Sequence, residues 1–265
     1  MTQSTVSCSV DTRGVATVSL NRAEKHNAFD DQVISELDAV FTDCANDTKV
    51  RVVILASQGK SFSAGADLEW MQRMAGYSRE ENQADARALA EMLRKLNAMP
   101  QPTIARVQGA AFGGAVGLVA CCDLAVGSEH AKFCLSEVKI GLIPATISPY
   151  VIAAMGQRAA RRYFISAEVM DAAKAHQLGL LSELCSSDEL DQRVDDLVAI
   201  LLDNGPVAVR ASKRLVLDYA NRPIDAEIIE DSCGRIADIR VSQEGQAGLQ
   251  AFLSKQTPPW RTNNV

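Results

Sequence analysis

Several residue types and patterns are scarce in this sequence. Aromatic residues make up 5% of the 265 residues, and they are not interleaved with basic side chains as in a surface that stacks single-stranded nucleic acid. The net charge of -6 and the pI near 5.2 also disfavour a phosphate backbone as partner. Charged residues interrupt every apolar run before it reaches the roughly twenty residues that span a bilayer. The sequence therefore predicts a soluble globular protein that binds neither nucleic acid nor a membrane.

Patterns typical of metal sites and disulfide frameworks are also missing. The seven cysteines are odd in number and include no C-x-x-C pair, and the N-terminal segment does not resemble a signal peptide. The three histidines, His26, His130 and His176, are too far apart in sequence to form the close ligand pairs of zinc sites. We therefore expect no metal and a cytoplasmic location.

The chain carries enough apolar residues for a full core, with 47% hydrophobic and 23% charged residues. Residues 5–10 and 15–20 favour a β-hairpin, and the apolar runs at 50–56 and 103–108 favour buried strands. Apolar residues recur at helical spacing over 31–45 and 79–99. The expected inward face of the second helix consists of Ala84, Ala88, Leu89, Met92, Leu93 and Leu96. Helical patterns then dominate the last third, at 190–202, 206–219, 226–240 and 242–253.

The stretch from 109 to 144 combines glycines with one isolated carboxylate. Gly109, Gly113, Gly114 and Gly117 follow a predicted strand, and a helix that starts near Gly114 would begin with N–H groups that have no intrahelical partner. Such donors, at the positive end of the helix dipole, suit a developing oxyanion. Glu137 follows the next short strand and is a candidate acid or base. Two interpretations stay open here, because the glycines can serve tight packing alone and Glu137 can be a solvated turn residue.

A second strand-to-helix turn lies at Ala64, Gly65 and Ala66. Asp67 starts an amphipathic segment in which Leu68, Met71 and Met74 share one helical face, so the Ala66 N–H would lie at another helix N-terminus. The alternative is an ordinary loop with a helix-capping aspartate. Two such turns, each after a buried strand, favour a pair of backbone donors.

Five stretches of the sequence resemble the enoyl-CoA hydratase/isomerase family, also called the crotonase superfamily. They are NRAEKHNAF at 21–29, FSAGADL at 62–68, the glycine-rich 107–133, LSEVKIGLIP at 135–144 and AFLSKQTP at 251–258. The resemblance implies an α/β fold, a spiral of repeated β-β-α units over residues 1–200. It also implies a C-terminal helical region over 201–265 that forms homotrimers, which often pair into hexamers.

The resemblance also assigns roles to individual residues. It places the oxyanion hole at the backbone N–H groups of Ala66 and Gly114, the same two amides that the turns suggest, with Gly113 beside them. It implies a coenzyme A groove to which Lys25 contributes, together with Lys255 of a neighbouring subunit. It adds three lining residues, Ala64, Asp67 and Leu68. Coenzyme A is part of the substrate, so no separate cofactor is expected. For each lysine the alternative is a solvated surface charge.

The sequence departs from the family pattern at one catalytic position. Hydratases of the family use two glutamates, but here the first position is Gly117, and only the second is kept, as Glu137. A glycine within a helix indicates either close packing or a need for pocket volume, and we hypothesise room for a branched or carboxylated acyl chain. Beyond Glu137, the hydroxyls of Thr146, Ser148 and Tyr150 can orient water or a distal substrate group, whereas capping of the next helix is the alternative for Thr146 and Ser148.

The combination of GGAVGLVACCD with LSEVKIGLIPATISPYV is similar to bacterial hydratases of the 3-methylglutaconyl-CoA type, which include enzymes for isohexenylglutaconyl-CoA. The resemblance therefore implies a lyase that adds or removes water across the α,β double bond of such thioesters, in leucine and isoprenoid breakdown. One alternative is a Δ3,Δ2-enoyl-CoA isomerase, which needs only the single base Glu137. Another is a catalytically inactive CoA-ester or RNA-binding protein built on the same fold.

Overall fold

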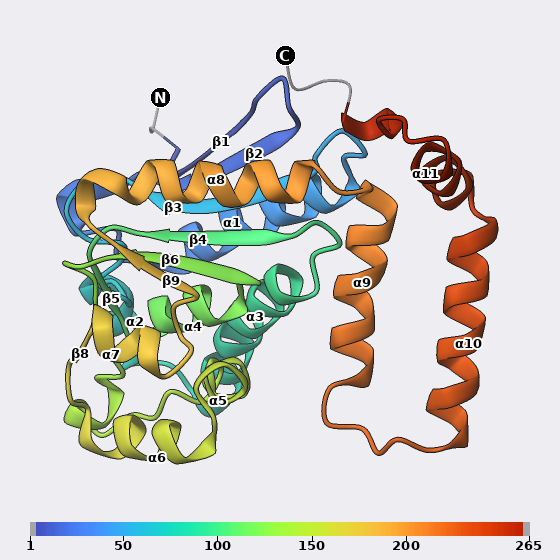
Figure 1. Cartoon of the computed structure of the whole chain (residues 1–265). Helices are drawn as coiled ribbons and strands as arrows, with labels where there is room; N and C mark the ends of the chain where they lie inside the picture. The colour runs from blue at the N-terminus through green and yellow to red at the C-terminus, as the bar shows by residue number, and fades with distance from the viewer. Residues whose placement is uncertain (1–3, 262–265) are drawn as a thin grey trace.

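The computed structural model describes residues 4–261 and contains a six-stranded sheet (Figure 1). The predicted hairpin is present as β1 (Val6–Val10) antiparallel to β2 (Val15–Leu20). The other neighbours are parallel, in the order β1-β2-β3-β4-β6-β9. The remaining strands are β3 (Val52–Ser57), β4 (Thr103–Val107), β6 (Leu124–Ser128) and β9 (Glu183–Cys185).

A second sheet of three strands provides the repeat that the sequence predicts. It contains β5 (Ala110–Phe112), β7 (Lys132–Cys134) and β8 (Met170–Asp171), in that order. Strand β4 leads into β5 and helix α4 (Gly114–Cys121), and β6 leads into β7 and the 3₁₀ helix η2 (Glu137–Ile140). This succession of strand, strand and helix confirms the expected α/β spiral of β-β-α units.

Helices cover both faces of the larger sheet (Figure 1). On one face, α8 (Leu190–Leu202) packs apolar side chains on Val15, Val52, Ile104 and Val126 of four strands. The main core lies on the other face. It includes buried side chains from α4 and from the helices at 31–46 and 79–97. Besides α4, the helices before α8 are α1 (Asp31–Asn46), α2 (Leu68–Met74), α3 (Arg79–Asn97), α5 (Ser148–Met155), α6 (Gln157–Ser166) and α7 (Ala172–Gln177). The short 3₁₀ helices are η1 (Ala23–Lys25), η3 (Ser187–Glu189) and η4 (Pro259–Arg261).

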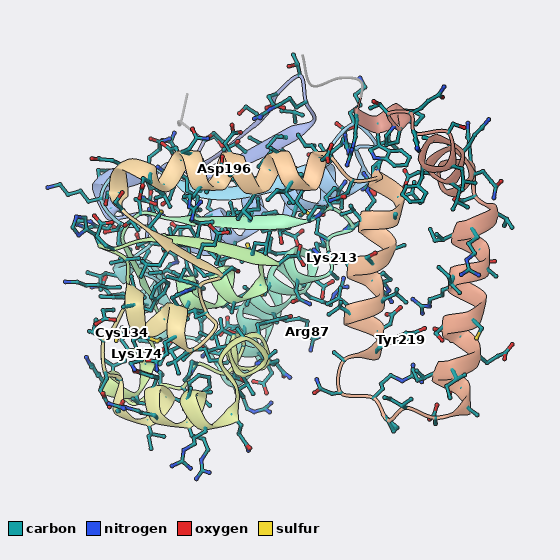
Figure 2. The ribbon with its side chains drawn as sticks, viewed as in Figure 1. Arg87, Cys134, Lys174, Asp196, Lys213 and Tyr219 are labelled. Carbon is teal, nitrogen blue, oxygen red and sulfur yellow. The ribbon has the colours of Figure 1, made fainter. Side chains whose placement is uncertain are left out.

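The last helices extend away from the sheets as an arm (Figure 1). They are α9 (Pro206–Tyr219), α10 (Ala226–Val241) and α11 (Gln243–Leu253). Lys213, labelled in Figure 2, ties α9 to the body, since its Nζ lies 2.7 Å from Asp123 Oδ2 and donates to Gln101 O at 3.1 Å. The expected division at residue 200 falls inside α8, which packs on the sheet, so a separate C-terminal unit stays a prediction.

Two expected helix faces are confirmed only in part, since Leu89 and Met74 pack against the main core. In α2 the buried residue is Trp70, whereas Leu68 is 75% exposed. In α3 the buried side chains are Met92, Leu93 and Leu96, and the expected inward alanines, Ala84 and Ala88, are exposed. Helical spacing identifies residues that share a face, but it does not show how far the neighbouring element extends along that face. None of the helices within residues 4–261 is both long and apolar enough for a bilayer.

Candidate active site

The turn at residues 63–67 is held by backbone hydrogen bonds on both sides. Ser63 N–H donates to Ala110 O and Phe112 N–H donates to Ser63 O, both at 3.0 Å, which fixes the turn to β5. Phe29 N–H donates to Gly65 O at 2.9 Å, and Asp67 N–H donates to Phe29 O at 3.0 Å.

These last two bonds make Phe29 and Ala66 a parallel bridge pair. In that arrangement the bonds come from the residues on either side of Ala66, so its own N–H points away from Phe29. Within residues 4–261 the Ala66 N–H has no acceptor. A free backbone donor therefore lies where the sequence predicts one.

The second donor is the first amide of α4. Gly113 has φ of 55°, a conformation that side chains disfavour, and its N–H donates to Cys134 O at 2.8 Å. Val116 N–H donates to Gly113 O at 3.0 Å, and the Gly114 N–H has no acceptor in the described part of the chain. The helix dipole gives this amide added positive character.

The two turns lie against each other, and Phe29 contacts both. A Cβ atom added to Gly65 would lie 2.7 Å from Phe112 O and 3.8 Å from Gly113 Cα. A Cβ atom added to Gly114 would lie 2.6 Å from Phe29 Cζ. The backbone of Phe29 thus pairs with the first turn while its ring packs on the second, so one residue spaces the two free amides. The sequence analysis did not single out this role of Phe29.

Glu137 begins η2 beside the second turn. A Cβ atom on Gly113 would lie 3.3 Å from Glu137 Oε1, so the carboxylate is adjacent to the turn that presents Gly114. The residue is half-buried, and Oε2 is buried without a hydrogen-bond partner among the described residues. Burial raises the pKa of Glu137, and a hydrogen bond from its own backbone opposes this only in part. A carboxyl group with a raised pKa holds its proton more firmly than an exposed glutamate does, which suits it to acid–base catalysis.

The space at position 117 is filled, contrary to the hypothesis of open pocket volume. Gly117 is buried on α4, and a Cβ atom there would lie 2.2 Å from Ile147 Cγ2 and 2.7 Å from Ile147 Cβ. Ile147 itself is 1% exposed. Close packing, the alternative from the sequence, is what the structure shows. The position at which the similar hydratases carry their first glutamate is therefore packed against the side chain of Ile147.

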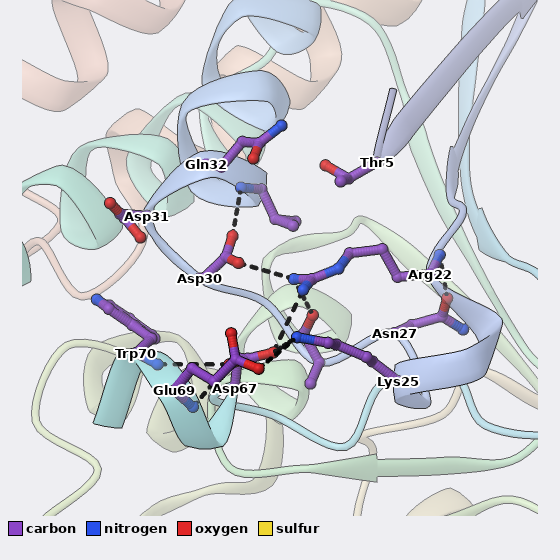
Figure 3. A network of polar contacts seen from close by, with 12 residues as sticks. Thr5, Arg22, Lys25, Asn27, Asp30, Asp31, Gln32, Asp67, Glu69 and Trp70 are labelled. Atoms are coloured by element: carbon purple, nitrogen blue, oxygen red, sulfur yellow. Dashed lines mark hydrogen bonds and ion pairs between the residues drawn. The ribbon is translucent and has the colours of Figure 1, made fainter. Parts of the chain in front are cut away.

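Arg22, Lys25, Asp30 and Asp67 form a network next to the first turn (Figure 3). Arg22 Nη1 lies 2.9 Å from Asp30 Oδ2, and Arg22 Nη2 lies 3.3 Å from Asp67 Oδ2. Lys25 Nζ lies 3.4 Å from Asp67 Oδ2 and 3.2 Å from Glu69 Oε1. Lys25 was visible in the sequence stretch at 21–29, but its pairing with Asp67 and Glu69 was not.

Asp67 has the capping role that the sequence left as an alternative. Its Oδ1 accepts from Glu69 N–H at 2.8 Å and from Trp70 N–H at 3.4 Å, and the residue is 4% exposed. Burial alone would raise the pKa of Asp67, but these N–H donors and Lys25 lower it, so the group stays ionised. Its side chain is occupied by protein partners and does not line an open surface.

The other expected substrate contacts lie on the surface. Ala64 is exposed, with its N–H bonded to His26 O at 2.9 Å, and Lys25 is 39% exposed at its side chain. Lys255 is exposed near the C-terminus and has φ of 55°. These residues keep their proposed roles as predictions.

The expected cap of α5 is wrong. Ile147 holds the N-cap position without a side-chain hydrogen bond, and Ser148 Oγ donates to Ala145 O at 2.8 Å instead. Pro149 in the first turn needs no N–H partner, which makes a side-chain cap less necessary. No cluster of three or more His, Cys, Asp or Glu side chains within residues 4–261 is arranged to hold a metal ion.

Known proteins resemble this chain in sequence and fold. A family model described as Enoyl-CoA hydratase/isomerase matches residues 11–263. An enoyl-CoA hydratase structure from Shewanella pealeana has a TM-score of 0.93 at 47% identity, and the match covers 97% of this chain and 96% of that one. One from Mycobacterium smegmatis has a TM-score of 0.93 at 31% identity, covering 98% and 100%. A crotonyl-CoA hydratase from Syntrophomonas wolfei is 30% identical over 246 residues, covering 91% and 92%. The chain belongs to the enoyl-CoA hydratase/isomerase family of enzymes.

Proposed function

We propose that this enzyme adds water across the α,β double bond of a branched glutaconyl-CoA thioester, or removes it in the reverse reaction. The candidate substrates are 3-methylglutaconyl-CoA and isohexenylglutaconyl-CoA, in leucine and isoprenoid breakdown. The observation that carries the chemistry is the half-buried Glu137 carboxylate, whose Oε2 has no partner among the described residues, beside a turn with a free helix-start amide. The choice of acyl group rests on the similarity of residues 113–123 and 135–151 to such hydratases.

In the proposed mechanism, the thioester oxygen accepts hydrogen bonds from the N–H groups of Ala66 and Gly114. Negative charge builds on that oxygen as water attacks the β-carbon, and each fixed donor is worth about 3 kcal/mol in the transition state. Glu137 takes the proton of the attacking water, and that proton or one from a second water is delivered to the α-carbon. The product gains one hydroxyl and one hydrogen, so the net reaction is the addition of water.

The substrate's coenzyme A portion provides the remaining contacts in this proposal. Lys25 of this chain would lie near the nucleotide phosphates, together with Lys255 of the partner subunit. Ala64 and Leu68 would line the groove. Leu68 is accessible for a contact with coenzyme A, because the residue is 75% exposed. Coenzyme A enters with the substrate and leaves with the product, so the reaction needs no further cofactor.

We also propose that the arm of α9–α11 assembles the protein into trimers, which then pair into hexamers. Large apolar side chains are exposed along all three helices, including Val216 at 68%, Ile229 at 54% and Phe252 at 81%. Exposed apolar surface of this extent is typical of an interface between proteins. Light scattering during size-exclusion chromatography would give the mass of the assembly, and a monomer would contradict this part.

A second candidate is the Δ3,Δ2-enoyl-CoA isomerase. The packing of Ile147 against Gly117 favours it, because moving a proton between two carbons requires one base and no second carboxylate. In that reaction Glu137 would remove a proton from the α-carbon and return it to the γ-carbon, or the reverse, and the product would have the mass of the substrate.

Substitution of Glu137 tests its role in either reaction. Glu137→Gln should reduce turnover of 3-methylglutaconyl-CoA by about 10²-fold or more, the usual contribution of acid–base catalysis. Binding of the thioester, followed by calorimetry, should change little, since the amide keeps the shape of the side chain. Glu129→Gln is a matched control, because Glu129 is an exposed carboxylate paired with His130. Full activity of Glu137→Gln would remove this residue from the mechanism.

A further inference from the structure

Two cysteines from different elements lie sulfur to sulfur at the edge of the larger sheet. Cys8 belongs to β1 and Cys44 to the last turn of α1, and their Sγ atoms are 4.0 Å apart. Cys8 is an exposed residue, whereas Cys44 is 4% exposed. Within residues 4–261, no other two cysteines share a hydrogen-bonding contact.

We propose that Cys8 and Cys44 are a reactive thiol pair, which a low-molecular-weight disulfide oxidises to a Cys8–Cys44 disulfide. Cys8 is the thiol that reacts first, because it is accessible from solvent. Cys44 is the resolving thiol, because it is only 4% exposed and its Sγ lies against that of Cys8.

The position of β1 permits the two sulfur atoms to approach. A disulfide bond is about 2.05 Å long, so the atoms have to move together by about 2 Å. β1 is the edge strand of the sheet and pairs only with β2 (Figure 1), which leaves its other side unrestrained by a neighbouring strand. Val6 and Cys8 are two residues apart in β1, so their side chains lie on the same face of the strand. Val6 packs in the same core cluster as Cys44. The face that carries Cys8 is therefore turned toward α1.

The local electrostatics give the two thiols different reactivity. The hydrogen bond from Cys44 lowers the pKa of Cys8 to about 7, against opposing effects of burial and the Asp43 carboxylate. The same contact and burial raise the pKa of Cys44. The thiolate is the nucleophile in thiol–disulfide exchange, so Cys8 is activated and Cys44 is not. Burial raises the pKa of the Cys121 and Cys134 thiols, which makes both less reactive.

The reaction proceeds in two exchanges. The Cys8 thiolate attacks one sulfur of the external disulfide, which forms a mixed disulfide and releases one thiolate. Cys44 loses its proton to the released thiolate and attacks the Cys8 sulfur, which expels the second thiolate. In total, two protein thiols are oxidised, one external disulfide is reduced to two thiols, and the two protein protons end on those thiols. An excess of a reducing thiol reverses both steps.

Peptide mapping after treatment of the whole protein with glutathione disulfide tests this proposal. Remaining thiols are blocked with N-ethylmaleimide before digestion without reductant. We expect a cross-linked pair of peptides that contain Cys8 and Cys44, lighter than the reduced peptides by two hydrogen atoms. The bond closes a loop between residues 36 positions apart, so Tm should also rise by several degrees and return after reduction.

Single-residue variants distinguish a reaction of the Cys8–Cys44 pair from independent reactions of the two thiols. Cys44→Ala should stop the reaction at a stable mixed disulfide on Cys8, and Cys8→Ser should leave Cys44 with free thiol only. A mixed disulfide on Cys8 that persists in the unmutated protein, or a Cys8 that remains a free thiol after the treatment, would overturn the proposal.

Discussion

Ile147 occupies the volume that a side chain at Gly117 would need, since a Cβ atom on Gly117 would lie 2.2 Å from Ile147 Cγ2. Both residues are buried, and they come from α4 and from the N-cap of α5. The absence of a second glutamate is therefore matched by packing and not by an empty space. The proposed chemistry therefore rests on the single carboxylate of Glu137.

Substitutions at position 117 should be destabilising because of this contact. Gly117→Ala adds a methyl group against Ile147 and should lower the free energy of unfolding by about 1 to 3 kcal/mol. Gly234→Ala is the control, because Gly234 lies on α10 with no atom within 4 Å of the added methyl, and it should gain up to about 1 kcal/mol from helix propensity. Urea titrations of both variants would measure the difference.

The double variant Gly117→Ala/Ile147→Ala tests the contact itself. Ile147→Ala alone should cost about 2 to 5 kcal/mol through the cavity that it leaves. In the double variant the two changes should compensate in part, so its loss should be smaller than the sum of the single losses. Additive losses would show that Ile147 and Gly117 do not share this space.

Phe29→Leu should lower kcat with little change in KM. The ring of Phe29 packs on Gly114 while its backbone pairs with Ala66, so a smaller side chain should loosen the spacing of the two amide donors. We expect about a tenfold loss of kcat, since oxyanion contacts act in the transition state. Phe41→Leu is the matched control, because Phe41 is also fully buried but lies in the middle of α1. Equal effects of the two substitutions on steady-state kinetics would assign Phe29 to general stability alone.

Glu137→Gln should stabilise the fold near neutral pH. Burial raises the pKa of this carboxyl above its ordinary value of 4.5, so the folded state holds the proton more tightly than the unfolded chain. The unfolded chain therefore releases the proton first, and the free energy of unfolding falls as pH rises from 4.5 through the raised folded value. Glu137→Gln has no ionisable group at this position, so its free energy of unfolding does not fall in this way as pH rises.

Urea titrations near pH 7 and at about pH 4 would measure the effect of Glu137 on stability. The variant should exceed the unmutated protein at the higher pH, and the two should agree at the lower. An equal difference in the free energy of unfolding at both pH values would mean that the charge of Glu137 does not affect stability.

Local signals in the sequence predict most of the elements. The hairpin at 6–20 and helices α8 and α9 are found at the predicted residues, because turn residues, Pro206 and apolar spacing act within short segments. The two turns with their glycines were also visible, because the need for φ near 55° at Gly113 restricts the residue type.

What the sequence could not provide are contacts between distant segments. The pairing of Phe29 with Ala66 and the packing of Ile147 on Gly117 each join residues at least 30 positions apart. The exposure of Leu68, Ala84 and Ala88 depends in the same way on where neighbouring elements end. Glycine at position 117 was therefore open to two interpretations, and only the position of Ile147 distinguishes them.

The most direct test of the account is mass spectrometry of the CoA products formed from 3-methylglutaconyl-CoA in oxygen-18 water. The account predicts a product that is heavier by one labelled water, formed at equal rates by the unmutated protein and Glu129→Gln and about 10²-fold more slowly by Glu137→Gln. A product of unchanged mass with a shifted double bond would contradict the hydratase and make this protein an isomerase with Glu137 as its base.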